Sequence, residues 1–159
     1  MKILALEFSS QQRSVAIVDG SGVLSEITTD QLKTSPLVLI EQALQQARIG
    51  REEIQYLGIG IGPGSYTGVR SAIAVAQGWQ LARDTKLCAV SSAETLAATA
   101  RGNGLRGETH FIIDAQRHEY YHCTWKLDEQ TQQETTPLSI IGVTAAAELE
   151  AHGPDAAGF

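Results

Sequence analysis

The order of strand-like and helix-like segments is the feature that most constrains the fold of this chain. Residues 2–8, 14–18 and 23–28 are rich in apolar and β-branched side chains, and only short polar loops join them. Strands joined by loops this short pair antiparallel. Two later strand-like segments, residues 56–61 and 86–90, each follow a helical pattern, as parallel strands follow crossover helices. The sequence therefore predicts an α/β protein with a mixed sheet flanked by helices.

The first predicted helix spans residues 36–49 and carries apolar side chains at helical spacing. Ser35 is a candidate N-cap, and Pro36 stands at the first helical position, where proline is favoured. Gly50 is a candidate C-terminal stop. These end signals agree with the apolar spacing, so we expect one amphipathic helix here.

The second predicted helix spans residues 69–83 and follows the densest turn signal of the chain, Gly62-Pro63-Gly64-Ser65-Tyr66-Thr67-Gly68. A glycine loop before a helix can bind an anion through backbone N–H groups. This loop lacks the Gly-Lys-Ser/Thr of a P-loop. The favoured interpretation is a sharp turn that delivers Thr67 as the N-cap, and the anion site stays open as an alternative.

The run Arg101-Gly102-Asn103-Gly104 interrupts the regular patterns. It predicts a boundary between a first lobe, residues 1–100, and a second lobe, residues 101–159. Strands of the second lobe are expected at residues 111–114, 119–126 and 138–143.

Composition narrows the class of protein. Apolar residues make up 43% of the chain and charged residues 19%, as in ordinary globular domains. No apolar run approaches the roughly 20 residues that cross a bilayer, and the N-terminal run meets Glu7 too early for a signal peptide. We therefore expect a cytoplasmic protein without a membrane partner. The formal charge is −6 and the basic residues are scattered, so strong direct nucleic-acid binding is not expected.

The chain has two cysteines, Cys88 and Cys123, which form no Cys-x-x-Cys motif. Both lie in apolar stretches, and free cysteine is among the most buried residue types. Two buried free thiols are predicted.

Three segments resemble a known family. The first, Ile3-Leu4-Ala5-Leu6-Glu7-Phe8-Ser9-Ser10 with Ser14-Val15-Ala16-Ile17, is similar to the opening hairpin of the actin/Hsp70/sugar-kinase-like ATPase fold. The second, Gly60-Ile61-Gly62-Pro63-Gly64-Ser65-Tyr66-Thr67-Gly68-Val69-Arg70, is close to the signature of the TsaB (YeaZ) family. The third, Asp114-Ala115-Gln116-Arg117-His118-Glu119-Tyr120-Tyr121, is similar to that family's Asp-Ala-Arg…Glu-Val-Tyr segment.

The resemblance implies an actin-like ATPase, ribonuclease-H-like fold whose second lobe is shortened. It implies a non-catalytic scaffold that binds and stabilises TsaD, the threonylcarbamoyl transferase of the t6A37 modification of tRNA. The implied partners are a TsaD-like catalytic paralogue and a TsaE-like ATPase, with a homodimer when the chain is alone. No tightly bound cofactor is implied, and ATP or ADP at a shared interface is left open.

The catalytic relative TsaD binds a metal through His-x-x-x-His, placed after the strand that follows the Gly-Pro-Gly helix. At the corresponding place this chain has Ser91 and Thr95. Neutral hydroxyls are poor ligands for transition metals compared with imidazole. We therefore expect neither a catalytic metal nor catalytic residues, and this difference favours the scaffold over the enzyme.

The resemblance also implies which residues meet partners. In the family the two helices pair with the partner's equivalent helices, and the residues predicted for that interface are Leu37, Ile40, Leu44, Val69, Ala72, Ile73, Ala76 and Trp79. The hairpin and the glycine loop could face an anion or a nucleotide through Glu7, Ser9, Ser10, Gly62, Gly64 and Ser65. Polar residues at ordinary strand ends and turns are the alternative for this second set.

Two other function classes stay as alternatives. His118-Glu119-Tyr120-Tyr121-His122 matches the zinc-protease pattern, which needs a helix to bring both imidazoles to one metal. The aromatic and β-branched neighbours favour a strand, which would hold the two histidines roughly 13 Å apart at about 3.3 Å per residue. An independent ATP-binding protein is the second alternative.

Overall fold

The computed structural model describes residues 1–150. The chain divides into two compact units, of which the first is Met1–Ser92 and the second begins at Ala93. The lobe boundary that the sequence predicts, after residue 100, comes later in the chain than this division. It falls inside helix α3 (Ser92–Gly102). Residues 151–159 of the predicted second lobe lie outside the described residues. Within residues 1–150, no helix is long and apolar enough to cross a membrane.

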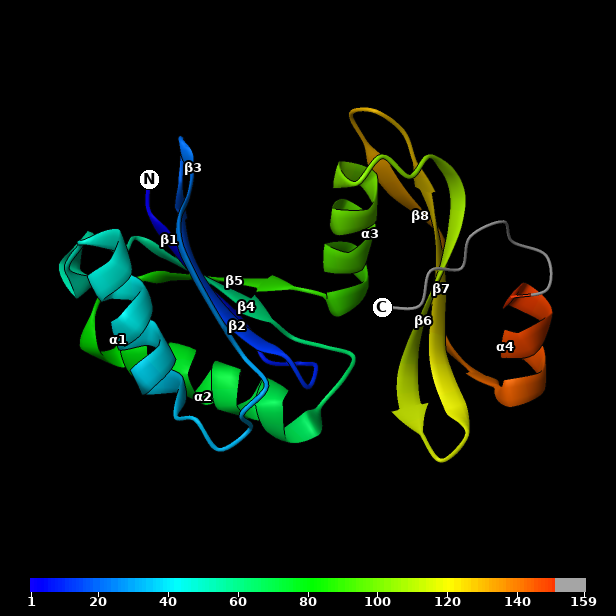
Figure 1. Cartoon of the computed structure of the whole chain (residues 1–159), viewed down its shortest axis with the longest axis horizontal. Coiled ribbons are helices and arrows are strands. Elements are labelled where there is room, and N and C mark those ends of the chain that lie inside the picture. The colour runs from blue at the N-terminus through cyan, green and yellow to red at the C-terminus, as the bar shows by residue number, and fades with distance from the viewer. Residues whose placement is uncertain (151–159) are drawn as a thin grey trace. The chain divides into compact units, whose positions relative to one another are not determined.

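Unit 1, Met1–Ser92, is built on a five-stranded mixed sheet (Figure 1). Across the sheet the strands are β3 (Gly22–Thr29), β2 (Arg13–Asp19), β1 (Ile3–Glu7), β4 (Tyr56–Gly60) and β5 (Lys86–Val90). The first three form an antiparallel meander, and β4 and β5 continue from β1 in parallel. The predicted mixed sheet is confirmed, and all five predicted strands are present.

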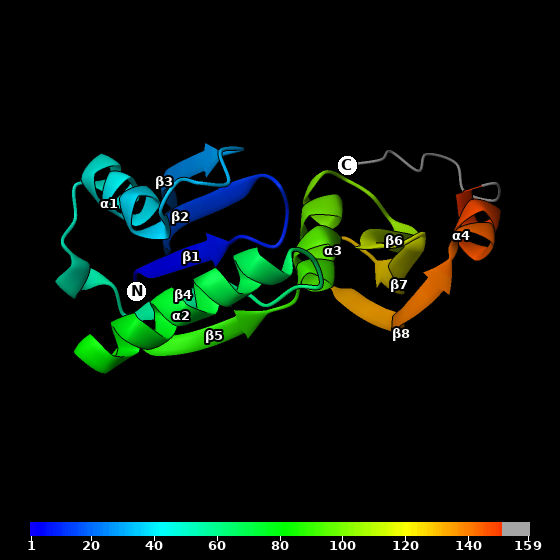
Figure 2. The ribbon, with the colours of Figure 1, turned by 90° about the horizontal axis from the view of Figure 1, so that it is seen from below.

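Helices α1 (Pro36–Ala47) and α2 (Tyr66–Ala82) touch each other and cover one face of this sheet (Figure 2). Alternate strand residues point toward the helices, which gives the buried positions their period of two. The core between the layers consists of Leu4, Leu6, Phe8, Val15, Ile17, Leu39, Ile40, Ala43, Leu44, Ile54, Leu57, Ile59, Ala72 and Ala76. Each large apolar side chain buried here contributes about 1.5–3 kcal/mol, so this layer holds unit 1 together.

Helix α1 ends at Ala47 with Arg48 as its C-cap, and the predicted stop at Gly50 is wrong. Arg48 adopts φ 57° and ψ 42°, in the left-handed region that usually selects glycine. The next N–H, of Ile49, donates to the Leu44 carbonyl at 3.2 Å, and Ile49 packs against the core. That bond and that contact hold the left-handed turn without a glycine. Gly50 instead precedes the short 3-10 helix η1 (Arg51–Glu53).

Ser65, and not the predicted Thr67, caps helix α2. The helix begins at Tyr66, and Ser65 Oγ accepts a hydrogen bond from the Gly68 N–H at 3.3 Å. Helix α1 begins as predicted, with Ser35 before Pro36, although the Ser35 side chain makes no capping hydrogen bond.

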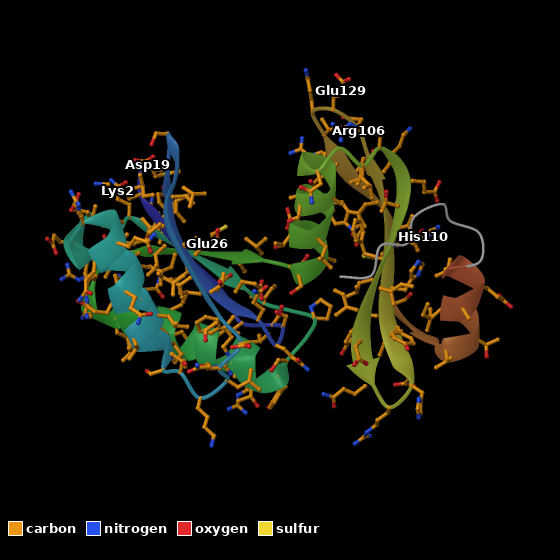
Figure 3. The ribbon with its side chains drawn as sticks, in the orientation of Figure 1. Lys2, Asp19, Glu26, Arg106, His110 and Glu129 are labelled. Atoms are coloured by element: carbon orange, nitrogen blue, oxygen red, sulfur yellow. The ribbon has the colours of Figure 1, made fainter. Side chains whose placement is uncertain are left out.

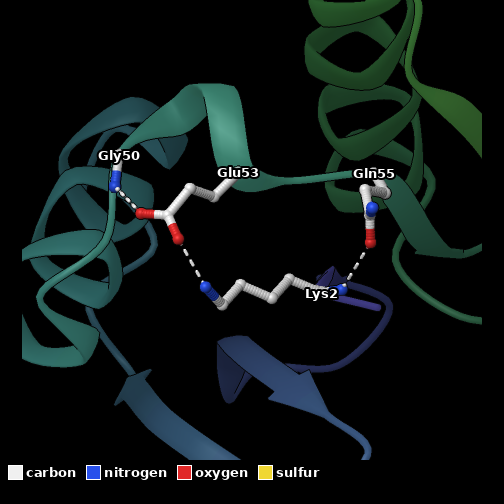
Figure 4. A network of polar contacts seen from close by, with 4 residues as sticks. All are labelled: Lys2, Gly50, Glu53 and Gln55. Atoms are coloured by element: carbon white, nitrogen blue, oxygen red, sulfur yellow. Dashed lines mark hydrogen bonds and ion pairs between the residues drawn. The ribbon is translucent and has the colours of Figure 1, made fainter.

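A polar network fixes the connection from α1 into β4 (Figure 4). Lys2 Nζ pairs with the Glu53 carboxylate, and the Gly50 N–H donates to the same carboxylate at 3.0 Å. The backbone N–H of Lys2 donates to Gln55 Oε1 at 3.0 Å. The hydrogen bond from Lys2, and then the one from Gly50, lower the pKa of Glu53. Because these groups are exposed, the network positions the segment more than it stabilises the fold.

Unit 2, described from Ala93 to residue 150, is a three-stranded antiparallel sheet with a helix on each face (Figure 1). Its strands are β6 (Gly107–Gln116), β7 (Glu119–Leu127) and β8 (Gln132–Gly142). The first two contain the predicted strands 111–114 and 119–126, whereas the strand predicted at residues 138–143 ends one residue earlier, because Val143 begins a helix. Helix α3 packs Ala97 and Ala100 against Phe111, Trp125 and Leu127. Helix α4 (Val143–Glu150) packs on the other face, against β7 and β8.

Candidate functional site

Polar side chains gather at the carboxyl ends of the parallel strands β1, β4 and β5. The Ser65 N–H donates to the Ser9 carbonyl at 2.5 Å, and Ser92 Oγ donates to Ser9 Oγ at 2.8 Å. The Ser92 N–H donates to the Gly62 carbonyl at 2.8 Å. The structure therefore joins the β1–β2 hairpin and the glycine loop, two predicted anion-facing segments that are distant in sequence. Ligands commonly bind at this edge of α/β sheets.

The predicted anion-facing residues use their polar atoms within this loop network. Glu7 Oε1 accepts the N–H of Ser9 at 2.7 Å, and Ser10 Oγ donates to the Gln12 carbonyl at 2.6 Å. A carboxylate at this edge also repels phosphate unless a cation lies between them. These hydrogen bonds explain the conformation of the hairpin as that of an ordinary structural turn. Contact with a nucleotide stays a prediction.

Two glycines let the glycine loop approach the hairpin. Gly64 has a φ of 151°, and a Cβ there would overlap the Ser9 carbonyl oxygen. A Cβ at Gly68 would overlap the Phe8 carbonyl oxygen. Helix α2 therefore starts in direct backbone contact with the end of β1, which sets where the helix lies on the sheet.

The predicted partner-interface residues fall into two groups. Four of them are at most 3% exposed and belong to the core of unit 1: Ile40, Leu44, Ala72 and Ala76. Leu37 is 60% exposed, and three are half-buried: Val69, Ile73 and Trp79. Helical spacing identifies the apolar face of a helix, and on α1 and α2 most of that face packs on the sheet of the same chain.

The outward side of α2 carries side chains that a partner could contact. Tyr66 is 73% exposed and Leu81 is 91% exposed, and Arg70 and Ala74 lie exposed between them at helical spacing. Arg70 Nη1 donates to the Tyr66 hydroxyl at 2.9 Å, and its guanidinium lies 5.2 Å from the ring centroid. We call Tyr66, Arg70, Ala74 and Leu81 the outer α2 face.

The zinc-protease pattern does not lie on a helix. His118 stands in the β6–β7 turn with a φ of 64°, and Glu119 begins β7, which also carries His122. The strand predicted for this segment is present, so the helix that the protease alternative requires is contradicted. Among residues 1–150, no group of three or more His, Cys, Asp or Glu side chains could hold a metal ion.

His122 contacts a second histidine that the sequence analysis did not single out. His110 Nδ1 on β6 (Figure 3) lies 3.1 Å from His122 Nε2 and 3.0 Å from Thr124 Oγ1. Burial, and then the neighbouring His110, lower the pKa of His122. The antiparallel register, which pairs His110 with Thr124, brings the two rings together, and no local pattern reveals that register.

Cys123 is buried as predicted, but Cys88 is exposed. Cys88 pairs with Gly58 and lies on β5, an edge strand of the sheet in unit 1. The apolar run predicts a strand at this place but does not say which strand is the edge. Burial raises the pKa of the Cys123 thiol.

A family model described as TsaD, tRNA N6-adenosine threonylcarbamoyltransferase, matches residues 2–157. The chain is 32% identical over 132 residues to the tRNA threonylcarbamoyladenosine biosynthesis protein TsaB of Escherichia coli (strain K12). The chain belongs to this family, in its TsaB/YeaZ group. The TsaB protein of Bacillus subtilis (strain 168) is 28% identical over 140 residues. These matches cover 81% and 86% of the chain.

The solved structure of YeaZ from Pseudomonas aeruginosa superposes with a TM-score of 0.80 at 26% identity, over 89% of this chain and 66% of that chain. The predicted family and fold class, an actin-like and ribonuclease-H-like α/β protein, are thus confirmed. The chain spans 57% and 60% of the lengths of the two TsaB relatives.

Proposed function

We propose that the chain is a non-catalytic subunit that binds a TsaD-like threonylcarbamoyl transferase and stabilises its active conformation in t6A37 modification of tRNA. The observation that carries the proposal is the outer α2 face, together with TsaB relatives named for tRNA threonylcarbamoyladenosine biosynthesis. The mechanism is differential binding, in which the subunit binds the competent conformation of the transferase more tightly than the others. Because tRNA is the substrate of the complex, the proposal places the chain in the cytoplasm.

The chemistry of the outer α2 face supports a helix-to-helix contact. Leu81 is 91% exposed, and an apolar side chain left in water gains by being covered. Tyrosine and arginine are enriched at binding hot spots, and Arg70 already holds the Tyr66 ring in place. Ala74 between them is small enough for a partner helix to approach closely. The same face would pair two copies when the transferase is absent, and a TsaE-like ATPase would join the assembled pair.

The residues at the junction of β5 and α3 support a non-catalytic role. Ser91 and Thr95 stand where the resembled catalytic relative has two metal-binding histidines. Hydroxyls hold a transition metal poorly. A subunit that acts by binding does not need that metal.

The test is the affinity of the chain for the TsaD-like transferase of the same organism, measured by calorimetry. Leu81→Arg should raise Kd at least about 30-fold, because a hot-spot residue contributes about 2 kcal/mol or more. Leu105→Arg is the matched control, since Leu105 is 43% exposed and lies in unit 2. Ala76→Arg, at a residue predicted for the interface, would not test partner binding. Ala76 is completely buried, and the substitution would disrupt the core of unit 1.

An unchanged Kd for Leu81→Arg would remove the outer α2 face from the interface. Absence of binding by the unmodified chain would contradict the proposed function itself. A similar loss for Leu105→Arg would show that any added charge weakens the complex, and the proposed surface would then be wrong.

A further inference from the structure

Arg13 is a buried charge on the helix-covered face of the sheet in unit 1. It opens β2, and its side chain points to the same side as Val15 and Ile17, with which it alternates in burial. The residue is 7% exposed, as little as an apolar core residue. Arginine is almost never buried to this extent unless it is paired.

No oxygen of unit 1 compensates this charge. Arg13 Nε is buried without a hydrogen-bond partner. Residues 1–92 form two ion pairs among themselves, Lys2–Glu53 and Arg51–Glu41, and neither includes Arg13. The contact that the guanidinium does make is with the Phe8 ring, whose centroid lies 5.6 Å from the guanidinium carbon.

A ring contact satisfies the flat face of a guanidinium but not its N–H edge. The group has five N–H donors in a planar fork. Stacking on Phe8 offsets part of the lost hydration, whereas the buried Nε–H still lacks an acceptor. The two terminal nitrogens of Arg13, unlike Nε, are not completely buried. An acceptor from outside the chain can therefore reach the two terminal nitrogens of the fork, although not Nε itself.

The starts of the two covering helices and the end of β1 do not place a carboxylate on the face of Arg13. Neither α1 nor α2, the helices that cover this face, has an acidic residue in its first turn. Glu7 pairs with Ser14, the residue that follows Arg13 on β2. Because successive strand residues point to opposite faces, the Glu7 carboxylate lies on the face of the sheet opposite to Arg13. The site is therefore separate from the loop network of Glu7 and Ser9 described above.

We propose that Arg13 binds an oxyanion, a phosphate group or a carboxylate, that presents two oxygens to the guanidinium fork. Such groups match the fork bidentately, and the bond is strengthened where water is largely excluded. The proposal concerns the isolated chain and does not depend on the proposed transferase partner.

The test compares thermal and urea unfolding in chloride, in inorganic phosphate and in acetate, at one ionic strength. A bound anion at about ten times its Kd raises the folding constant about 11-fold. The unmodified chain should show this rise, and Arg13→Met should not. In chloride alone Arg13→Met should be at least as stable as the unmodified chain, because it removes a charge that lacks an acceptor. Arg70→Met is the matched control, since Arg70 is exposed, and it should keep the anion effect.

Direct detection keeps the test independent of the variants. Phosphate or acetate should shift the Arg13 Nε–H resonance of the unmodified chain in NMR spectra. A response to both anions would identify a general oxyanion site, and a response to one would identify which group it takes. No anion-dependent stabilisation of the unmodified chain would overturn the proposal, as would an equal rise in Arg13→Met. A chloride-only stability of Arg13→Met below that of the unmodified chain would show that stacking on Phe8 satisfies the arginine, and would also overturn it.

Discussion

Replacing Gly68 by alanine should destabilise unit 1, whereas the same replacement of Gly78 should stabilise it. Both glycines lie in α2, so each variant adds one methyl group to the same helix. At Gly68 the new Cβ would overlap the Phe8 carbonyl oxygen, and at Gly78 nothing lies within 4 Å. The pair therefore separates close backbone packing from helix propensity.

The two effects can be given magnitudes. Gly78→Ala should gain about 0.5–1 kcal/mol, the advantage of alanine over glycine inside a helix. Gly68→Ala gains at most as much, but it must move α2 away from the end of β1, and overpacking costs about 1–3 kcal/mol. Because the clashing atom of Phe8 is backbone and cannot rotate away, we expect the upper part of that range. The variants should differ by about 2–4 kcal/mol in the free energy of unfolding.

Urea unfolding followed by Trp79 fluorescence measures unit 1, because Trp79 packs against the core of that unit. The other tryptophan of the chain, Trp125, lies in unit 2 and is replaced by phenylalanine in the parent and in both variants. The unfolding midpoint should fall for Gly68→Ala and rise for Gly78→Ala. Equal midpoints in the two variants, or a midpoint of Gly68→Ala above the parent, would refute the close contact between α2 and β1.

Three further predictions concern titratable groups. The free energy of unfolding of unit 2 should fall as the pH drops below about 6.5, the ordinary pKa of histidine. The fold lowers the pKa of His122, so the unfolded chain takes up the proton at a higher pH than the folded chain does. Urea titrations of His122→Gln should show a flatter dependence on pH. Thr131→Val should raise the pKa of Asp128 from about 2, because Thr131 Oγ1 donates to its carboxylate at 2.7 Å, and an unchanged carboxyl NMR titration would contradict that cause. DTNB should label Cys88 rapidly and Cys123 only on unfolding, and a fast phase that survives in Cys88→Ser would show that Cys123 is accessible.

Elements set by local patterns could be predicted from the sequence. The strand expected at residues 86–90 is β5 (Lys86–Val90), and the meander follows from the short loops between the first three strands. The end of α1 shows where local rules compete. A glycine is the common signal for a left-handed turn, but Arg48 takes that conformation because the following residue, Ile49, is held by the core.

Features set by tertiary packing could not be predicted in the same way. The spacing of Ile40 and Ala76 marks an apolar helical face, but it does not say whether a partner or the sheet of the same chain covers that face. The His110–His122 contact depends on strand register. Arg13 is different. It alternates with Val15 and Ile17 at the strand period of two, and this spacing in the sequence indicates that Arg13 shares their buried face.

Size-exclusion chromatography with light scattering, on the chain mixed with its TsaD-like transferase, tests the central claim most directly. The account predicts one peak with the summed mass of the two proteins for the unmodified chain and for Leu105→Arg. It predicts two separate peaks for Leu81→Arg at the same concentrations. Two peaks for the unmodified chain would contradict the proposed function, and a stable complex with Leu81→Arg would contradict the proposed surface.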